Sequence, residues 1–197
     1  MLRTRIVAAV AIAVGLTTMI AGPAQAHRDS YSTSFVDGGG AINDDWGDHD
    51  NELGGDLCQG CANSSNTDLV ILWQSVLAAE GLLSHSGIDG SFGSGTKAAT
   101  ERWQERYGIS SDGRVGPNTW DKADDRLTWT STGVSLRYDG WGTSGKINFV
   151  RGNSAEGTPY GDGSYTMYSV GDDDNSDGTY FTGSHHIYLK SRSLTAN

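Results

Sequence analysis

Two cysteines lie three positions apart, in the segment Cys58–Cys61, and the chain contains no others. In an exported protein this pattern favours a disulfide that closes a tight loop, since the compartment is oxidising and no other thiol competes. A redox-active C-x-x-C pair is the alternative, but that chemistry needs a βαβ setting that the neighbouring sequence lacks. Two cysteines also exclude a zinc site built from four cysteines.

Acidic and histidine residues offer metal binding as a second kind of chemistry. Residues 173–178 read D-D-N-S-D-G, the first half of a calcium loop, but Ser184 stands where that loop needs a bidentate glutamate. We therefore expect an acidic turn here, with weak calcium binding as the alternative. His185 and His186 adjoin a predicted strand, where adjacent side chains point to opposite faces and make a poor pair of ligands. We expect no metal site and no cofactor.

The sequence carries no catalytic motif of the hydrolase or nucleotide-binding kind: H-E-x-x-H, G-x-S-x-G and the phosphate-binding loop are all absent. Glu101 and Glu105 share one face of a predicted helix, but nothing sets the carboxylate separation that a glycosidase requires. We therefore expect a protein that is not an enzyme, with no catalytic residue to name.

The N-terminus has the features of a secretory signal. Arg3 and Arg5 precede an apolar run over residues 6–20, and Ala24-Gln25-Ala26 fits a signal-peptidase site. The apolar run is shorter than the roughly 20 residues that span a bilayer. We predict a signal peptide at residues 1–26 and a secreted or cell-wall location, with a retained membrane anchor as the alternative. No later stretch is apolar enough for a membrane span, so no membrane contact is expected after cleavage.

Length and charge narrow the class of protein. A chain of 197 residues accommodates one large domain or two small ones. It has 24 acidic and 14 basic residues, a formal net charge of -10. This balance argues against nucleic acid as a partner, because such binding needs a basic surface.

The exported chain divides into three parts. Residues 27–65 are polar and rich in turn formers, and we expect a flexible arm because few apolar groups are present to offset the entropy of ordering. Residues 66–126 carry helical patterns, and residues 127–197 carry short alternating runs typical of antiparallel strands. The predicted fold class is α+β, a small three-helix bundle followed by a small antiparallel β domain. The alternating runs lie at 134–138, 147–151, 165–169 and 187–189.

Three helices are predicted in the middle part. The first, over Asn66–Leu83, is apolar nearly all round and should be buried on more than one side. We expect its stripe of Leu69, Leu72, Val76 and Leu83 to face the β domain. The second helix covers Ser94–Tyr107, and a third begins at a proline, a residue that the first helical position tolerates.

An octet with the pattern D-G-x-h-G-x-x-T, in which h is an apolar residue, occurs twice, at Asp89–Thr96 and Asp112–Thr119. A Trp-Gln pair precedes each copy. Asp-Gly forms a turn with positive φ. We expect the apolar residue to plug the end of the bundle and the next glycine to sit near a helix N-cap. The threonine hydroxyl should bond to backbone groups of the first turn.

From Val70 to Trp120 this double unit resembles the bacterial peptidoglycan-binding domain of the three-helix type. The shared pattern reads V-x-x-W-Q-x-x-L, G-L, I-D-G-x-F-G-x-x-T-x-x-A, W-Q, Y-G-I and D-G-x-V-G-x-x-T-W, with Trp73 where the family usually has leucine. The resemblance implies a non-catalytic module that holds a secreted protein on cell-wall peptidoglycan. The contacts that it implies for a ligand of sugars and carboxylates are Ser91, Arg102, Arg106, Arg114 and Asn118. Tyr107 and Trp120 would stack on sugar faces if they are exposed, with burial in the core as the alternative.

Two other functions stay open for the part without a family resemblance. Residues 127–197 could hold the site of a cell-wall hydrolase, either an amidase or a carboxypeptidase. They could instead bind or inhibit another exported protein.

Overall fold

The computed structural model describes residues 34–38, 41–47, 56–130, 135–141, 145–152, 163–171, 178–183 and 186–197. The predicted signal peptide and the acidic motif at 173–177 lie outside the described residues, as does His185. Within the described ranges, no helix is long and apolar enough to cross a membrane.

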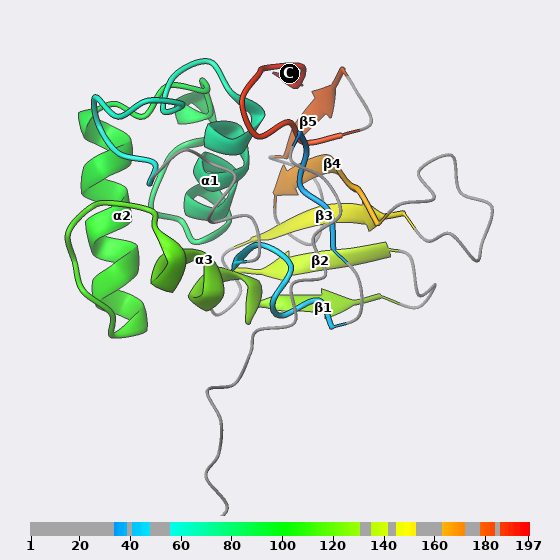
Figure 1. The fold of residues 1–197 in the computed structure, drawn as a ribbon, viewed down its shortest axis with the longest axis horizontal. Coiled ribbons are helices and arrows are strands. Elements are labelled where there is room, and N and C mark those ends of the chain that lie inside the picture. Colours follow the sequence, from blue (N-terminus) through cyan, green and yellow to red (C-terminus); the bar gives the residue numbers. More distant parts are fainter. Residues whose placement is uncertain are drawn as a thin grey trace, which may run out of the picture.

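Three α-helices precede six strands in the described residues, which confirms the α+β class (Figure 1). The helices are α1 (Asp68–Ala79), α2 (Ser94–Tyr107) and α3 (Pro117–Asp124), with a 3-10 turn, η2 (His85–Gly87), after α1. The strands are β1 (Leu127–Trp129), β2 (Ser135–Asp139), β3 (Lys146–Arg151), β4 (Tyr165–Gly171), β5 (Thr179–Thr182) and β6 (Thr195–Ala196). They form one sheet in the order β1-β2-β3-β4-β5-β6, and every neighbouring pair is antiparallel.

Local sequence accounts for the ends of the helices. The hydroxyl of Thr67 accepts a hydrogen bond from the Val70 N–H at 3.3 Å and caps α1. The helix ends earlier than predicted because Gly81 adopts a φ of 67° that turns the chain away. Helix α2 has its predicted bounds and ends at Gly108, which is left-handed. Helix α3 begins at its proline, as predicted.

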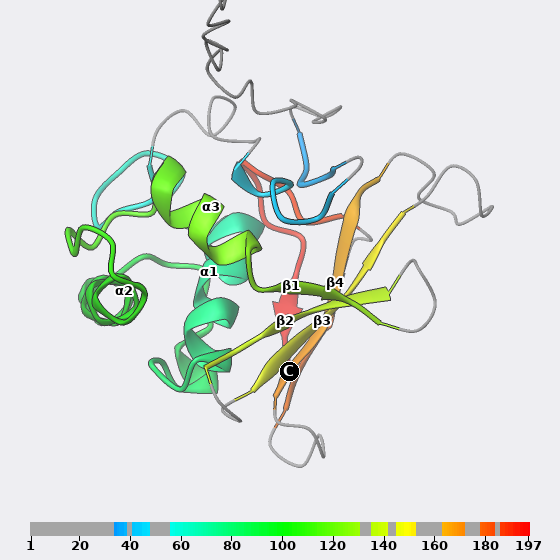
Figure 2. The ribbon, with the colours of Figure 1, turned by 90° about the horizontal axis from the view of Figure 1, so that it is seen from below.

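The sheet buries one face against the helices. Leu136 pairs with Phe149 and Tyr138 pairs with Ile147, and all four side chains are buried. The helices lie on one side of the sheet (Figure 2). The alternation predicted for residues 134–138 and 147–151 is confirmed where the structure describes it.

A bulge changes the alternation in β4. Phe149 pairs with Met167 but Asn148 pairs with Ser169, so Tyr168 is an extra residue on β4. Val170 therefore pairs with Ile147 and is buried in the core beyond the bulge. The predicted alternation of Tyr165, Met167 and Ser169 is wrong at its last position for this reason.

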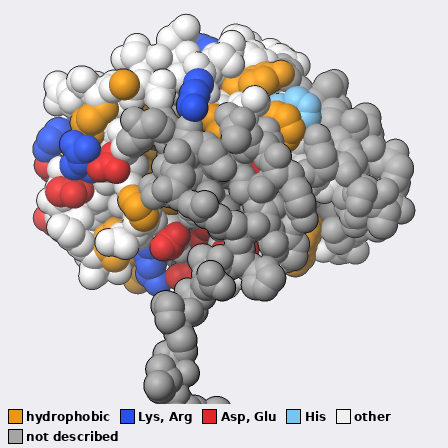
Figure 3. Space-filling model, in the orientation of Figure 1, with side chains coloured by type: hydrophobic (Ala, Val, Ile, Leu, Met, Phe, Trp, Pro, Cys, Tyr) orange, Lys and Arg blue, Asp and Glu red, His pale blue; other side chains and the backbone are white. Residues whose placement is uncertain are grey.

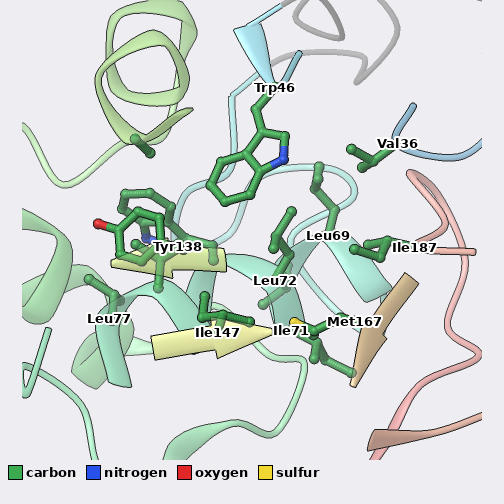
Figure 4. Packing of buried hydrophobic residues seen from close by; sticks show 14 of the residues in the cluster. Val36, Trp46, Leu69, Ile71, Leu72, Leu77, Tyr138, Ile147, Met167 and Ile187 are labelled. Carbon is green, nitrogen blue, oxygen red and sulfur yellow. The ribbon is translucent and has the colours of Figure 1, made fainter. Parts of the chain in front are cut away.

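Helix α1 lies between α2 and the sheet, and all twelve of its residues are buried (Figure 1). Leu69 and Leu72 point toward Ile147, Met167 and Ile187 (Figure 4). The prediction that this stripe faces the β domain is confirmed for Leu69 and Leu72, whereas Leu83 lies beyond the end of the helix and is only partly buried. One hydrophobic cluster includes residues from the helices and from the sheet, so the two parts share a core.

The described segments of residues 27–65 also contribute to that core. Val36, Trp46 and Leu57 are at most 2% exposed. The Trp46 ring contacts Tyr138 and Phe149 of the sheet, with centroids 6.0 and 5.8 Å away. The expectation that too few apolar groups exist here to pack is wrong for these residues, because each fills a space between larger elements.

Residues 187–189 do not form the predicted strand. Tyr188 makes an isolated bridge with Phe35, and Ile187 and Leu189 are buried. The carboxylate of Asp68 accepts hydrogen bonds from the N–H groups of Tyr188, Ser193 and Leu194 at 2.7–3.2 Å. The start of α1 thus fixes the C-terminal segment in place of a strand ladder.

Candidate functional site

A buried glutamine organises the first Asp-Gly turn. The Gln74 amide donates to Asp89 Oδ1 at 2.8 Å and to the Ser91 carbonyl at 3.1 Å, while Gln74 Oε1 accepts from the N–H groups of Asp89 and Gly90. Asp89 Oδ1 also accepts from the Ser91 N–H at 2.8 Å. Gly90 has a φ of 77°, as the pattern predicts.

The second turn repeats this arrangement around Gln104. Its amide donates to Asp112 Oδ1 at 3.1 Å and to the Arg114 carbonyl at 2.7 Å, and its Oε1 accepts from the Gly113 N–H at 2.9 Å. Asp112 Oδ1 accepts from the Arg114 N–H at 2.9 Å. The aspartates are therefore turn formers whose hydrogen bonds are internal.

The threonines of the octets act differently from the expectation. Thr96 and Thr119 hydroxyls accept from the Gln74 and Gln104 amides, each at 3.2 Å. Both threonines are buried, so their hydroxyls link the helix start to the glutamine instead of bonding to first-turn N–H groups. The glycine N-caps and the plugging residues, Phe92 and Val115, are as predicted.

The predicted ligand contacts fall into separate places on the domain. Ser91 and Asn118 are exposed in the first turn and in α3. Arg114 lies beside the disulfide, where its Nε pairs with Asp56 at 2.7 Å. Arg102 and Arg106 lie together, since they donate to the backbone carbonyls of Leu82 and Glu80 at 2.8 and 2.9 Å. The structure brings only this last pair to one place.

Two other sequence expectations concern neighbouring groups. Cys58 and Cys61 form the predicted disulfide, just before α1. Trp120 is 1% exposed and belongs to the core, whereas Tyr107 is half-buried. Trp120 is therefore closed to a sugar ring.

Glu80 is the functional candidate that sequence reasoning missed. Its carboxylate has no exposed surface and accepts four hydrogen bonds. The hydroxyls of Tyr107 and Tyr138 donate to Oε1 at 2.6 and 2.7 Å. Arg106 Nη1 and the Trp141 N–H donate to Oε2 at 2.7 and 3.2 Å. A glutamate at the end of an otherwise apolar helix was the only signal in the sequence.

The electrostatic consequence falls on the two tyrosines. Burial and the Glu80 charge raise the pKa of Tyr107 and that of Tyr138 well above the ordinary tyrosine range. Both hydroxyls keep their protons and act as permanent donors to Glu80. The carboxylate thereby joins α1, α2 and the segment after β2.

A second buried polar cluster lies where the N-terminal segment meets the sheet. Asp45 pairs with Arg151 at 3.1 Å and accepts from the Tyr165 hydroxyl. Asp124 Oδ2 accepts from the Trp46 N–H at 3.1 Å. Burial, reinforced by nearby carboxylates, raises the pKa of Asp124 to about 8. Among the described residues, no group of three or more His, Cys, Asp or Glu side chains is placed to hold a metal ion.

Comparison with known proteins identifies the helical part. Residues 66–122 match the family described as "Putative peptidoglycan binding domain". The zinc D-Ala-D-Ala carboxypeptidase of Streptomyces albus G is 43% identical over 51 residues, which are 26% of this chain and 20% of that enzyme. This chain thus covers about a fifth of the relative's length. No solved structure matches the chain.

The match and the geometry agree. The family covers both Asp-Gly turns and all three helices up to residue 122, and it stops before the sheet. Residues 66–122 are therefore a peptidoglycan-binding domain, joined through a shared core to a six-stranded sheet that this family does not cover.

Proposed function

We propose that the chain is a secreted, non-catalytic protein that attaches to cell-wall peptidoglycan through residues 66–122. The family match over two intact Asp-Gly turns is the observation that carries this proposal. The signal-like sequence of residues 1–26 supports export.

We assign the ligand to the side of α2 on which Arg102 and Arg106 lie, and we call it the α2 surface. These two arginines offer donors to the sugar hydroxyls and carboxylates of peptidoglycan. Basic and acidic side chains lie close together on the side of the molecule where α2 is found (Figure 3), and the helix itself contains three basic and two acidic residues. The local charge is thus near balance although the whole chain is acidic, and salt screens charges more than about 8 Å away.

The test is co-sedimentation of the exported chain with purified insoluble peptidoglycan at physiological salt. We expect enrichment in the pellet over an unrelated protein of equal net charge. Arg102→Ala should weaken binding several-fold. The matched control is Lys122→Ala, which removes an exposed cation of α3 that pairs with Asp125, the residue after the helix. Equal recovery of the chain and the unrelated protein would reject the proposal.

A cell-wall peptidase is the second candidate, and the name of the Streptomyces relative is the observation that favours it. The aligned stretch is short, so that enzyme's activity transfers to this chain only as a hypothesis. Clearing of a cell-wall suspension by the chain, abolished by a chelator, would establish the peptidase. No change in turbidity under conditions where the chain binds would leave the attachment function alone.

A further inference from the structure

The segment after β2 places a large aromatic side chain beside the α2 surface. Trp141 is 54% exposed, the most exposed of the large hydrophobic side chains that the structure describes. Strand β2 ends next to the helices (Figure 1). The ring centroid of Trp141 is 5.9 Å from that of Tyr107, with the two planes nearly perpendicular.

Buried and half-buried polar groups hold Trp141 in this position. The backbone N–H of Trp141 donates to the buried Glu80 carboxylate at 3.2 Å. The two residues before Trp141 are held by Arg126, whose guanidinium donates to the carbonyls of Asp139 and Gly140 at 2.6–2.8 Å. The backbone is thus fixed from two elements, and little entropy is lost when the ring receives a ligand.

Cations complete the surface. The Arg106 guanidinium lies 6.0 Å from the Trp141 ring centre, and that of Arg126 lies 5.7 Å from the Tyr107 ring centre. Among the described residues, Arg106 forms its hydrogen bonds through Nη1, and no acceptor there is recorded for Nε or Nη2. A flat ring beside guanidinium donors suits a sugar, whose C–H face stacks on the ring while its oxygens accept hydrogen bonds.

We propose that Trp141 extends the peptidoglycan site across the junction and stacks on a sugar ring of the glycan strand, with Arg106 donating to the same sugar. This rests on the proposed function. It assigns part of the site to the segment after β2, outside the residues that the family covers, and it names the glycan as the ligand there in preference to the stem peptide.

Trp129 provides a matched control. It is also an exposed tryptophan, at 40%, and the Arg151 guanidinium lies 5.6 Å from its ring centre. Strand β1 runs away from the helices before it ends at Trp129 (Figure 1). The two residues therefore differ in their distance from the α2 surface more than in their chemistry.

The experiment compares the full exported chain with Trp141→Ala, Trp141→Tyr and Trp129→Ala. Binding is measured to insoluble peptidoglycan, to β-1,4-linked N-acetylglucosamine oligomers and to a free stem peptide. We expect Trp141→Ala to bind peptidoglycan and the oligomer about tenfold more weakly. Trp141→Tyr, which keeps a stacking ring, and Trp129→Ala should stay within about twofold of the parent.

The outcomes distinguish the stacking proposal from the proposed attachment function on which it rests. If the parent binds peptidoglycan and Trp141→Ala binds it as well as Trp129→Ala does, the stacking proposal is overturned while attachment stands. A loss confined to the stem peptide also overturns it. If the parent itself fails to bind, the proposed function fails. Melting curves of all four proteins are recorded to test whether a loss of binding comes from a loss of folding.

Discussion

The interior of the helical domain and its junction with the sheet use different chemistry. Inside the domain, neutral glutamines hold two similar turns, each with an aspartate close by in sequence. At the junction, the buried Glu80 carboxylate accepts from residues as far away as Trp141. The neutral networks are local and repeated, whereas the contacts of Glu80, like those of the buried Asp45 and Asp68, join residues far apart in the sequence. We therefore expect substitutions at the junction to lower the free energy of unfolding more than substitutions in the glutamine networks do.

Removal of the Glu80 carboxylate should have the largest effect. Glu80→Ala leaves the buried Tyr138 hydroxyl and the half-buried Tyr107 hydroxyl without their acceptor, and Arg106 keeps only the Glu80 backbone carbonyl as a partner there. We expect urea unfolding to show a loss of about 3–5 kcal/mol in the free energy of unfolding. Glu105→Ala, on the exposed side of α2, should change it by less than about 0.5 kcal/mol. Similar values for the two variants would remove the distinction between junction and interior.

The glutamine networks should rank next. Gln104→Ala leaves the buried Gly113 N–H unpaired, and Gln74→Ala does the same to Gly90. Each variant should lose about 2–3 kcal/mol, and the two losses should be alike because the turns are alike. The exposed Gln59 serves as the control for the substitution. Urea unfolding that finds one turn dispensable would break the equivalence of the two repeats.

Asp124 should make stability depend on pH. Its pKa is about 8 in the folded chain and about 3.9 in an unfolded one. The stability from the protonated form is therefore complete below about pH 3.9 and is lost as the pH rises through about 8. Asp124→Asn keeps an acceptor and carries no charge. Its stability relative to the parent should rise steadily between pH 4 and pH 8 and then level off.

The matched variant for that measurement is Glu105→Gln, because Glu105 is an exposed carboxylate on α2. Its difference from the parent should stay flat when melting temperatures are recorded across the same pH range. A flat difference for Asp124→Asn as well would show that the buried carboxylate is ionised throughout.

Arg114 should give the smallest change in stability. Its pair with Asp56 is exposed, so Arg114→Ala should cost less than about 1 kcal/mol. Co-sedimentation with peptidoglycan then isolates its role as a predicted ligand contact. Binding that equals the parent's would restrict the ligand surface to α2 and the junction.

The sequence was sufficient for the helical domain because its information is local. The spacing of Asp89–Thr96 and Asp112–Thr119 fixes two turns and two helix starts, and the bounds of α2 followed directly. The role of Gln74 and Gln104 was visible only as a repeated Trp-Gln pair. Their hydrogen bonds close over the short distances that such a repeat encodes.

The junction could not be predicted because its contacts join residues far apart. Trp46 is a single aromatic residue in a polar segment, and no period marks it as core. Glu80 reads as the polar end of a helix until β2 brings Tyr138 to it. The bulge at Tyr168, which puts Val170 in the core, depends on the partner strand. Strand register and buried charge are properties of the assembled sheet.

The most direct test of the account is the affinity of the exported chain for purified peptidoglycan, measured by co-sedimentation at physiological salt. The account predicts saturable binding that Arg102→Ala weakens several-fold and Lys122→Ala leaves unchanged. Recovery no greater than that of an unrelated protein of equal charge would contradict it.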